Sequence, residues 1–357
     1  MERFATVPEQ PEAKRLLSAA ISDGPVNAYL LHGPAGVGKT ATARLFASAL
    51  LGDDERAARE RPTHPDLYVL EPLGEMIRID EIRALRHDLH MRPFEADRRI
   101  YLVLQAHAMN EDAADALLKD LEEPPDYATI VLVADELGPL PETIRSRCQL
   151  VPFRRLSDQA VRHWLSEREP DLDETTRAAI ARASGGRLDR AARLLDHAAA
   201  ERRAALIEVA RSVYLDESFE PAAAAAVVLD AMSKAGEVAR TWEQQELEGR
   251  DLPTREADQR VRRAQRGAER EELLLAFEGL AAWYRDLVVV AAGASRAVAQ
   301  ADRVEDLEAD AAAGAAAHAD DAAEAARAAW RDAEEFNVNA SLALESLFVR
   351  LRRMLAR

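Results

Sequence analysis

The chain has 357 residues, a length that suggests two or three domains. Its net charge of −17 excludes a free-standing nucleic-acid-binding protein, because such proteins usually carry a basic face that displaces counterions from phosphates. The single cysteine, Cys148, excludes an internal disulfide and a thiolate metal cluster. Because the sequence has neither a long apolar run nor an apolar signal core, we expect a cytoplasmic protein with no membrane contact.

Residues 1–154 alternate short apolar runs with amphipathic stretches, which is the pattern of an α/β domain. The runs of strand length are Ala28–His32, Leu67–Leu70, Ile100–Gln105, Thr129–Ala134 and Gln149–Phe153. Helical patterns lie between them, at Ala41–Leu51, Asp80–His90 and Glu111–Glu123. We therefore predict a parallel sheet that is covered by helices on both faces.

A complete phosphate-binding motif, G-x-x-x-x-G-K-[ST], follows the first predicted strand. It consists of Gly33, Pro34, Ala35, Gly36, Val37, Gly38, Lys39 and Thr40. Glycines let the backbone fold tightly and point N–H groups at phosphate oxygens, and the following helix adds the positive end of its dipole. Lys39 would reach the β and γ phosphates, and Thr40 would place a hydroxyl on Mg²⁺. The motif predicts binding of ATP or ADP with Mg²⁺.

The acidic residues of a hydrolysing P-loop enzyme are missing where they are first expected. Such an enzyme needs an apolar strand that ends in carboxylates, which hold Mg²⁺ and orient the attacking water. The strand at Ile100 ends in Leu104 and Gln105, neither of which is a carboxylate. A second apolar strand is followed by Asp135 and Glu136, which would make the chain an active ATPase if they served these roles. Periodicity does not decide between the two strands.

The remainder of the chain is dominated by alanine, leucine, arginine and glutamate, and we expect it to be helical. A short helical unit over residues 155–197 contains a break at Ser184-Gly185-Gly186. Longer helices over residues 198–357 are interrupted at Gly249–Pro253 and Gly293. We read the alanine-rich segment Ala291–Ala329 as helix.

The last predicted helix carries one apolar stripe with helical spacing. Its residues are Leu344, Leu347, Phe348, Leu351 and Leu355. We expect the stripe to pack inside the chain; the alternative is a subunit interface.

The motifs between Ala113 and Cys148 resemble those of the bacterial DNA polymerase III clamp loader, a branch of the AAA+ proteins. They are Ala116-Leu117-Leu118-Lys119, Leu121-Glu122-Glu123-Pro124-Pro125 and Thr143-Ile144-Arg145-Ser146-Arg147-Cys148, and with the P-loop and His64-Pro65-Asp66 they occur in that family's order. The resemblance implies an AAA+ domain over residues 1–154, a helical lid over 155–197 and a helical collar over 198–357. It also implies a hetero-oligomeric ring.

Three features that the family uses for ATP hydrolysis are altered in this chain, at four positions. The strand-end acids correspond to Leu104 and Gln105, the polar sensor to Ala134, and the lid arginine to Asp189, unless the register slips to Arg187 or Arg190. In this register Asp135 and Glu136 are a solvated strand end. The pattern resembles the delta prime branch, which is mainly structural, so we expect weak or absent ATPase activity.

The resemblance also implies partners and a place in a larger enzyme. The expected partners are gamma/tau and delta subunits. The sliding clamp and primed DNA would be contacted through the complex. This complex is a component of a DNA-directed DNA polymerase, which is a nucleotidyltransferase. Zinc is not expected, because the interval from Leu51 to Thr63, where many relatives carry four cysteines, contains none.

Arg147 is the candidate catalytic residue. In the family, the arginine of Ser-Arg-Cys projects into the neighbouring subunit's ATP site and stabilises charge that develops on the γ phosphate. The alternative for Arg147 is a salt bridge in a hinge between domains. We expect Arg145 to be a surface charge and Cys148 a small buried packing residue.

Overall fold

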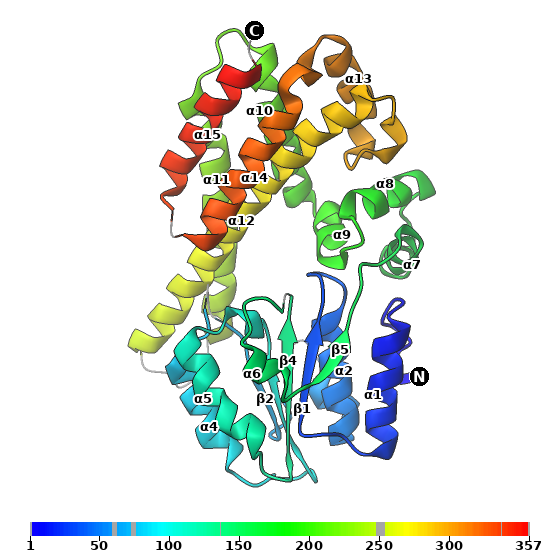
Figure 1. Ribbon diagram of the computed structural model, residues 1–357, viewed down its shortest axis with the longest axis vertical. Coiled ribbons are helices and arrows are strands. Elements are labelled where there is room, and N and C mark those ends of the chain that lie inside the picture. Colours follow the sequence, from blue (N-terminus) through cyan, green and yellow to red (C-terminus); the bar gives the residue numbers. More distant parts are fainter. Residues whose placement is uncertain are drawn as a thin grey trace. The chain divides into compact units, whose positions relative to one another are not determined.

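The structure is a computed structural model of the chain (Figure 1). It describes residues 2–58, 63–72, 76–135, 137–247, 254–336 and 338–355. The chain separates into two compact units, Met1–Leu172 with Gly185–Arg190, and Asp173–Ser184 with Ala191–Arg357. The first unit contains the predicted α/β domain, and the described part of the second is helical.

Five parallel strands form the sheet of the first unit, in the order β2-β3-β4-β1-β5 (Figure 1). They are β1 Ala28–His32, β2 Leu67–Leu70, β3 Arg99–Val103, β4 Ala128–Ala134 and β5 Gln149–Pro152. Each strand coincides with a predicted apolar run, so the predicted parallel sheet is confirmed. In the centre, Leu30 of β1 lies opposite Leu132 of β4 and Leu150 of β5. The end of β4 is therefore directly beside the loop that follows β1.

Strand β3 ends earlier than the predicted run Ile100–Gln105. The Leu104 N–H still donates to the Leu70 carbonyl oxygen at 2.8 Å. Gln105, however, adopts a left-handed conformation with φ 51° and precedes the 3-10 turn η2, Ala106–Ala108. The strand cannot continue through this residue, because an extended strand requires a negative φ.

Helices cover both faces of the sheet, as predicted (Figure 1). Helices α1 Pro11–Asp23 and α2 Lys39–Leu51 lie on one face, and α4 Ile79–Leu89 and α5 Glu111–Glu122 lie on the other. Successive strand residues point to opposite faces: Leu30 packs in the core beneath α4 and α5, whereas the Tyr29 ring lies 5.0 Å from the Phe46 ring of α2. Shorter elements of this unit are η1 Glu2–Phe4, α3 Asp54–Ala57 and α6 Glu142–Arg145.

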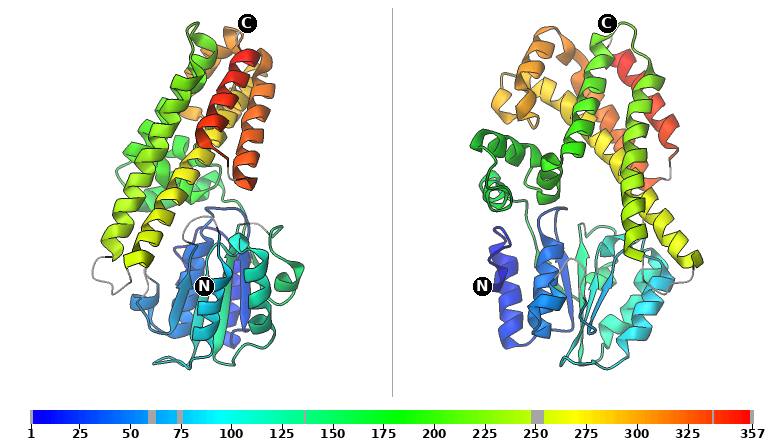
Figure 2. Two further views of the ribbon diagram at one scale, coloured as in Figure 1. Left: turned by 90° about the vertical axis from the view of Figure 1, so that its left-hand side faces the viewer. Right: turned by 180° about the vertical axis from the view of Figure 1, so that it is seen from behind.

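The second unit is built on two long helices that run side by side, α11 Pro221–Leu247 and α12 Thr254–Ala291 (Figure 2). Helix α14, Ala319–Glu335, packs against α12, and α15, Ala340–Leu355, packs against α11. Helix α10, His197–Leu215, contacts α11, α12 and α15. Trp283, Tyr284 and Phe277 of α12 are fully buried in the shared core. None of the helices within the described ranges is long and apolar enough to cross a membrane.

The apolar stripe of α15 lies in this core. Leu344, Leu347, Phe348 and Leu351 are at most 4% exposed, and Leu355 packs against the same cluster. Burying a side chain of this size stabilises a fold by about 1.5–3 kcal/mol. The prediction that the stripe packs inside the chain is confirmed.

The segment Ala291–Ala329 is helical in pieces rather than continuously. It contains η3 Ser295–Ala297, η4 Ala301–Arg303, α13 Val304–Ala312 and η5 Ala315–His318 before α14 begins. Gly293 and Gly314 have φ of 78° and 95°. A residue with positive φ cannot lie inside a right-handed helix. Gly293 is therefore the predicted interruption, and Gly314 is a second one that was not predicted.

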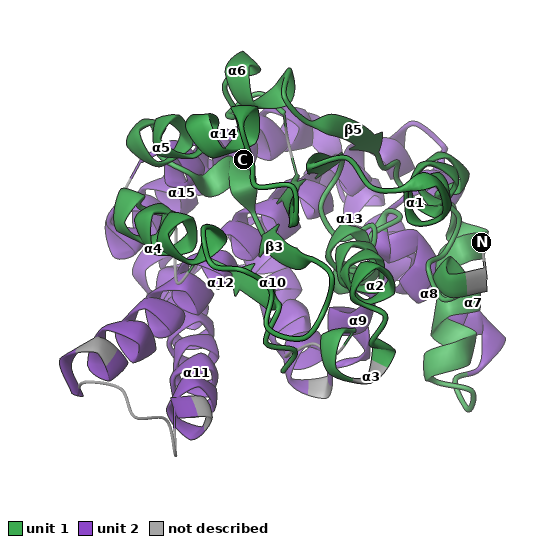
Figure 3. Ribbon diagram, turned by 90° about the horizontal axis from the view of Figure 1, so that it is seen from below, with its two compact units in different colours: residues 1–172, 185–190 green, residues 173–184, 191–357 purple. Residues whose placement is uncertain are grey.

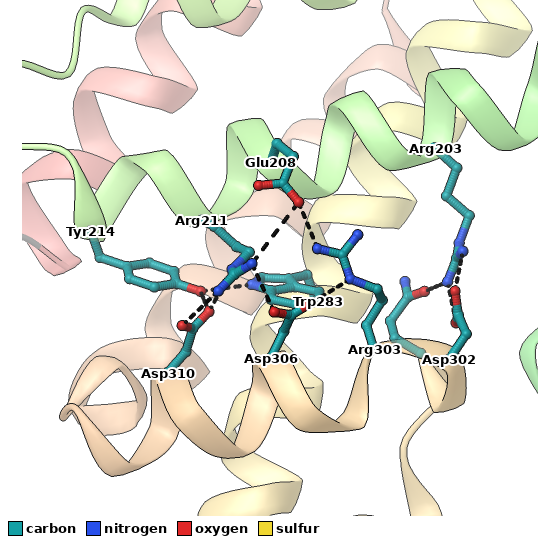
Figure 4. Close-up of polar contacts among 10 residues, drawn as sticks. Arg203, Glu208, Arg211, Tyr214, Trp283, Asp302, Arg303, Asp306 and Asp310 are labelled. Carbon is teal, nitrogen blue, oxygen red and sulfur yellow. Dashed lines mark hydrogen bonds and ion pairs between the residues drawn. The ribbon is translucent and has the colours of Figure 1, made fainter.

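A network of ion pairs ties these pieces to α10 (Figure 4). Asp310 of α13 accepts from the Arg211 guanidinium at 2.9 and 3.1 Å and from the Tyr214 hydroxyl at 2.7 Å. Arg211 also pairs with Asp306 at 3.0 Å, and the Trp283 indole N–H donates to the Tyr214 hydroxyl at 3.0 Å. Hydrogen bonding to Asp310 raises the pKa of Arg211. Charge pairs therefore hold the short helix α13 to α10, in addition to the fully buried Leu307 in the apolar core.

Residues 155–197 contribute to both units (Figure 3). They form α7 Asp158–Arg168, α8 Glu174–Ser184 and α9 Leu188–Leu195. Helix α7 and residues Gly185–Arg190 group with the first unit, whereas α8 groups with the second. The predicted break after Ser184 is present, and at Gly186 a Cβ would lie 2.3 Å from the Leu156 carbonyl oxygen. The division into AAA+ domain, lid and collar stays a proposal.

Candidate nucleotide-binding site and exposed arginine

The phosphate loop connects β1 to α2 with the backbone that its glycines permit. Gly33, Gly36 and Gly38 have φ of 138°, 69° and 93°, values that residues with side chains rarely adopt. At Gly33 a Cβ would lie 2.2 Å from the Phe153 carbonyl oxygen. Gly38 precedes α2 and has no side chain to cap its first N–H groups, which leaves them to an anion. The backbone of this loop fits a phosphate.

The other motif residues support the loop in different ways. Val37 is fully buried, and Pro34 and Ala35 are half-buried. Thr40 stands half-buried in the first turn of α2. Its hydroxyl is the metal-binding group that the motif supplies, and its position in that turn is compatible with this role.

Lys39 is folded back into its own loop. Its Nζ donates to the carbonyl oxygens of Gly33, at 2.7 Å, and of Pro34, and it pairs with Oδ1 of Asp135 at 2.8 Å. An ammonium has three protons, so each has an acceptor within the protein. Burial lowers the pKa of Lys39, and the nearby carboxylates of Asp135 and Asp189 oppose that effect.

Asp135 reaches Lys39 because β4 lies beside β1 in the sheet. Its backbone N–H donates to Nδ1 of His107 at 3.1 Å, and His107 belongs to the turn η2 after β3. The ends of β3 and β4 are thus linked to the phosphate loop through His107 and Asp135. The sequence gives no sign of these contacts, since they depend on strand order.

A second carboxylate lies over the loop. A Cβ on Gly36 would be only 1.8 Å from Oδ1 of Asp189, and the Leu188 N–H donates to the Gly36 carbonyl oxygen at 2.6 Å. Arg187 pairs with Asp189 at 2.8 Å. Among the three residues considered for the lid position, Asp189 has a side chain that lies against Gly36.

The strand ends offer poor support for a metal-assisted hydrolysis. Leu104 is 2% exposed and Ala134 is fully buried, and Gln105 has no charge to offer Mg²⁺. Asp135, at the end of β4, reaches the loop, but its carboxylate is paired with Lys39. Glu136, the second acid of the alternative ATPase prediction, lies outside the described residues. The loop fits nucleotide phosphates better than the strand ends fit a metal.

Arg147 lies at the surface of the first unit, in the turn after α6. Its Nη1 donates to the Thr143 carbonyl oxygen at 2.8 Å and to Oγ of Ser146 at 3.4 Å. Its Nη2 pairs with the Glu122 carboxylate at the end of α5. The Arg147 side chain is 32% exposed, so an anion can still reach it. Sequence reasoning assigned no chemistry to Glu122.

Arg145 and Cys148 of the same motif are less exposed than Arg147. Arg145 is half-buried rather than a surface charge. Cys148 is also half-buried and packs against the core beneath α4 and α5. Burial raises the pKa of the Cys148 thiol to about 12, which fits a packing residue rather than a nucleophile.

The His64-Pro65-Asp66 motif has a structural explanation. Asp66 is fully buried, and its carboxylate accepts the backbone N–H groups of Phe94, Glu95 and Ala96 at 2.6–2.9 Å. Burial acts to raise the pKa of Asp66, but these donors and Arg99 outweigh it and hold the pKa below its usual value. The motif fixes the turn before β3.

Comparison with known proteins finds relatives of the first part of the chain. Residues 9–157 match the family model described as DNA polymerase III, delta subunit. The chain is 35% identical over 195 residues to the DNA polymerase III subunit delta′ of Pseudomonas aeruginosa, covering 51% of this chain and 60% of that protein. In these residues the chain is similar to clamp-loader proteins of the AAA+ type. It is also 30% identical over 215 residues to the DNA polymerase III subunit tau of Bacillus subtilis, covering 55% and 38%.

Both branches of the clamp-loader family are therefore represented among the relatives. A solved Thermotoga maritima structure, of a DNA polymerase III gamma subunit-related protein, is 18% identical with a TM-score of 0.45 over 96% of this chain and 99% of that one. The chain spans 60% and 38% of the two curated relatives' length. The activities and partners of these full-length proteins therefore apply to this chain only as proposals.

Proposed function

We propose that the chain is a delta prime-type subunit of the DNA polymerase III clamp loader. In this role it is a mainly structural subunit of a hetero-oligomeric ring with gamma/tau and delta subunits. The ring loads the sliding clamp onto primed DNA in the bacterial cytoplasm, as part of the polymerase holoenzyme. The chain itself binds ATP or ADP with Mg²⁺ at Gly33–Thr40 and hydrolyses it weakly or not at all.

One contrast carries the proposal: Arg147 is accessible at the surface, whereas the positions that the family uses for its strand-end acids and polar sensor hold no charged residue in this chain. Its strand ends are Leu104, Gln105 and Ala134, and its loop lysine is paired with Asp135. A guanidinium lowers the barrier to phosphoryl transfer by stabilising charge on the γ phosphate, and it can do so from a neighbouring subunit. Arg147 would act on the neighbour's nucleotide, not on the chain's own.

The experiment is ATP turnover by the complex assembled with gamma/tau and delta. Arg147→Ala should slow turnover by about 10³-fold at the site that the arginine reaches. Arg147→Lys should restore little, because an ammonium cannot reproduce the planar fork. Arg154→Ala is the matched control, since the Arg154 side chain is 86% exposed. Unchanged turnover in the Arg147→Ala complex would rule out the role in trans.

A second function, that of an active ATPase resembling gamma/tau, is favoured by one observation. Asp135 follows a strand next to β1 and lies 2.8 Å from Lys39, so it is close enough to take part in phosphate chemistry. Steady turnover by the isolated chain, lost in Asp135→Asn, would establish this function. Nucleotide binding without turnover would support the delta prime role instead.

A further inference from the structure

Two carboxylates of the protein, those of Asp135 and Asp189, lie against the phosphate loop, where a nucleotide would place its phosphates. Lys39 is 3% exposed, and its three protons are shared among Gly33, Pro34 and Asp135. A lysine held in this way cannot also donate to the β and γ phosphates. For the lysine to reach a ligand, at least one of these three contacts must be broken, and the contact with Asp135 is the one that a phosphate would replace with another anion.

The second carboxylate acts on the backbone of the loop. Asp189 lies against Gly36 so closely that even a methyl group there would collide with Oδ1. The adjacent Leu188 N–H holds the Gly36 carbonyl at 2.6 Å. Gly36 is in the middle of the segment whose N–H groups would face phosphate, so Asp189 and a phosphate chain compete for the same space.

Charge adds to this competition. Asp135 and Asp189 are both near Lys39, and Arg187 pairs with Asp189. The negative charge of the two carboxylates is therefore already balanced by cations of the protein. A di- or triphosphate would add several negative charges beside two carboxylates in a partly buried site, where charges are screened less than in water.

We propose that Asp135 and Asp189 are internal competitors of the nucleotide, which keep the phosphate loop closed until residues 185–190 move away from Gly36. The inference rests on the proposed nucleotide binding at Gly33–Thr40 and adds a mechanism that regulates this binding. His107 takes part as a positioning residue, since it holds the backbone of Asp135. The ligand that the closed loop disfavours most is the nucleoside triphosphate, because it carries the most charge.

The test is calorimetric titration of the full chain with ADP and with ATP, each with Mg²⁺. Asp135→Asn and Asp189→Asn should each bind about tenfold more tightly than wild type, with a larger gain for ATP than for ADP. Asp135→Glu, which keeps the carboxylate, should bind like wild type. Asp126→Asn is the matched control, because Asp126 is exposed in the turn before β4. Lys39→Ala should lose binding.

Hydrogen exchange provides a second measurement on the wild-type chain. The Leu188 amide, which donates to Gly36, should lose protection when ADP is added. If affinities in Asp135→Asn and Asp189→Asn equal that of Asp126→Asn while Lys39→Ala still abolishes binding, the competition is overturned and nucleotide binding stands. If even the Asp135→Asn, Asp189→Asn double variant binds neither nucleotide, both proposals fail.

Discussion

Glu122 and Arg147 form an ion pair between the end of α5 and the turn after α6. The two residues come from the two motifs that point most strongly to the clamp-loader family, and they are 25 positions apart in the sequence. The pair holds one terminal nitrogen of the guanidinium, and the Thr143 carbonyl holds the other. Arg147 is thus retained on its own subunit in the free chain, although its side chain is still partly exposed.

Replacing Glu122 by Gln should free Arg147. Ion pairs at exposed sites contribute about 0.2–1 kcal/mol, so the reactivity of Arg147 toward phenylglyoxal should rise by up to about fivefold. Peptide mass spectrometry of the modified isolated chain would measure this rate. Glu123→Gln is the control, because Glu123 is the exposed neighbour in the same motif. Equal rates in the two variants would show that the ion pair does not retain the arginine.

Replacing Gly33 by Ala should destabilise the first unit by about 3 kcal/mol. The new methyl group would meet the Phe153 carbonyl oxygen at 2.2 Å, and the φ of 138° disfavours any side chain. Gly138→Ala is the matched control, since a Cβ there meets no atom within 4 Å. Urea unfolding of both variants would measure the difference. A Gly33→Ala chain as stable as Gly138→Ala would contradict the described approach of β5 to the loop.

Replacing Asp310 by Asn should destabilise the second unit by about 2 kcal/mol. Asp310 is 4% exposed and accepts hydrogen bonds from both Arg211 and Tyr214 (Figure 4), and buried hydrogen bonds to a charged group are worth about 1.5–3 kcal/mol. Asp306→Asn should cost less than about 1 kcal/mol, because the Asp306 side chain is 34% exposed. Denaturant unfolding would compare them. A larger loss in Asp306→Asn would show that α13 is held differently.

Cys148 should be unreactive in the folded chain. Since burial raises its pKa to about 12, the neutral thiol predominates in mildly alkaline buffer, and the thiolate is the reactive form. Titration with a disulfide reagent should give no rapid reaction in native buffer and one thiol in denaturant. Reactivity should rise only as the pH approaches 12 or the chain unfolds. A fast native reaction would mean that the thiol is not packed against the core.

The sequence by itself determined the secondary-structure elements of the sheet and the phosphate-binding type of the loop after β1. Alternation of apolar runs with helical patterns located every strand of the sheet, because strands buried on both faces must be continuously apolar. The motif at Gly33–Thr40 specified the loop, since glycine alone tolerates its backbone angles. The apolar stripe of α15 located its buried face. Where local rules failed, as at Gln105 and Gly314, a left-handed residue ended an element.

Only the tertiary structure decided which charged groups meet. Asp135 reaches Lys39 because β4 lies beside β1, and periodicity carries no information on strand order. Asp189 meets Gly36 although they are far apart in the sequence, and Glu122 meets Arg147 across two helices. Such contacts depend on distance in space, over which electrostatic interactions act, and not on the local propensities that a sequence displays. The loop could be read from its residues, but the two carboxylates that hold it closed could not.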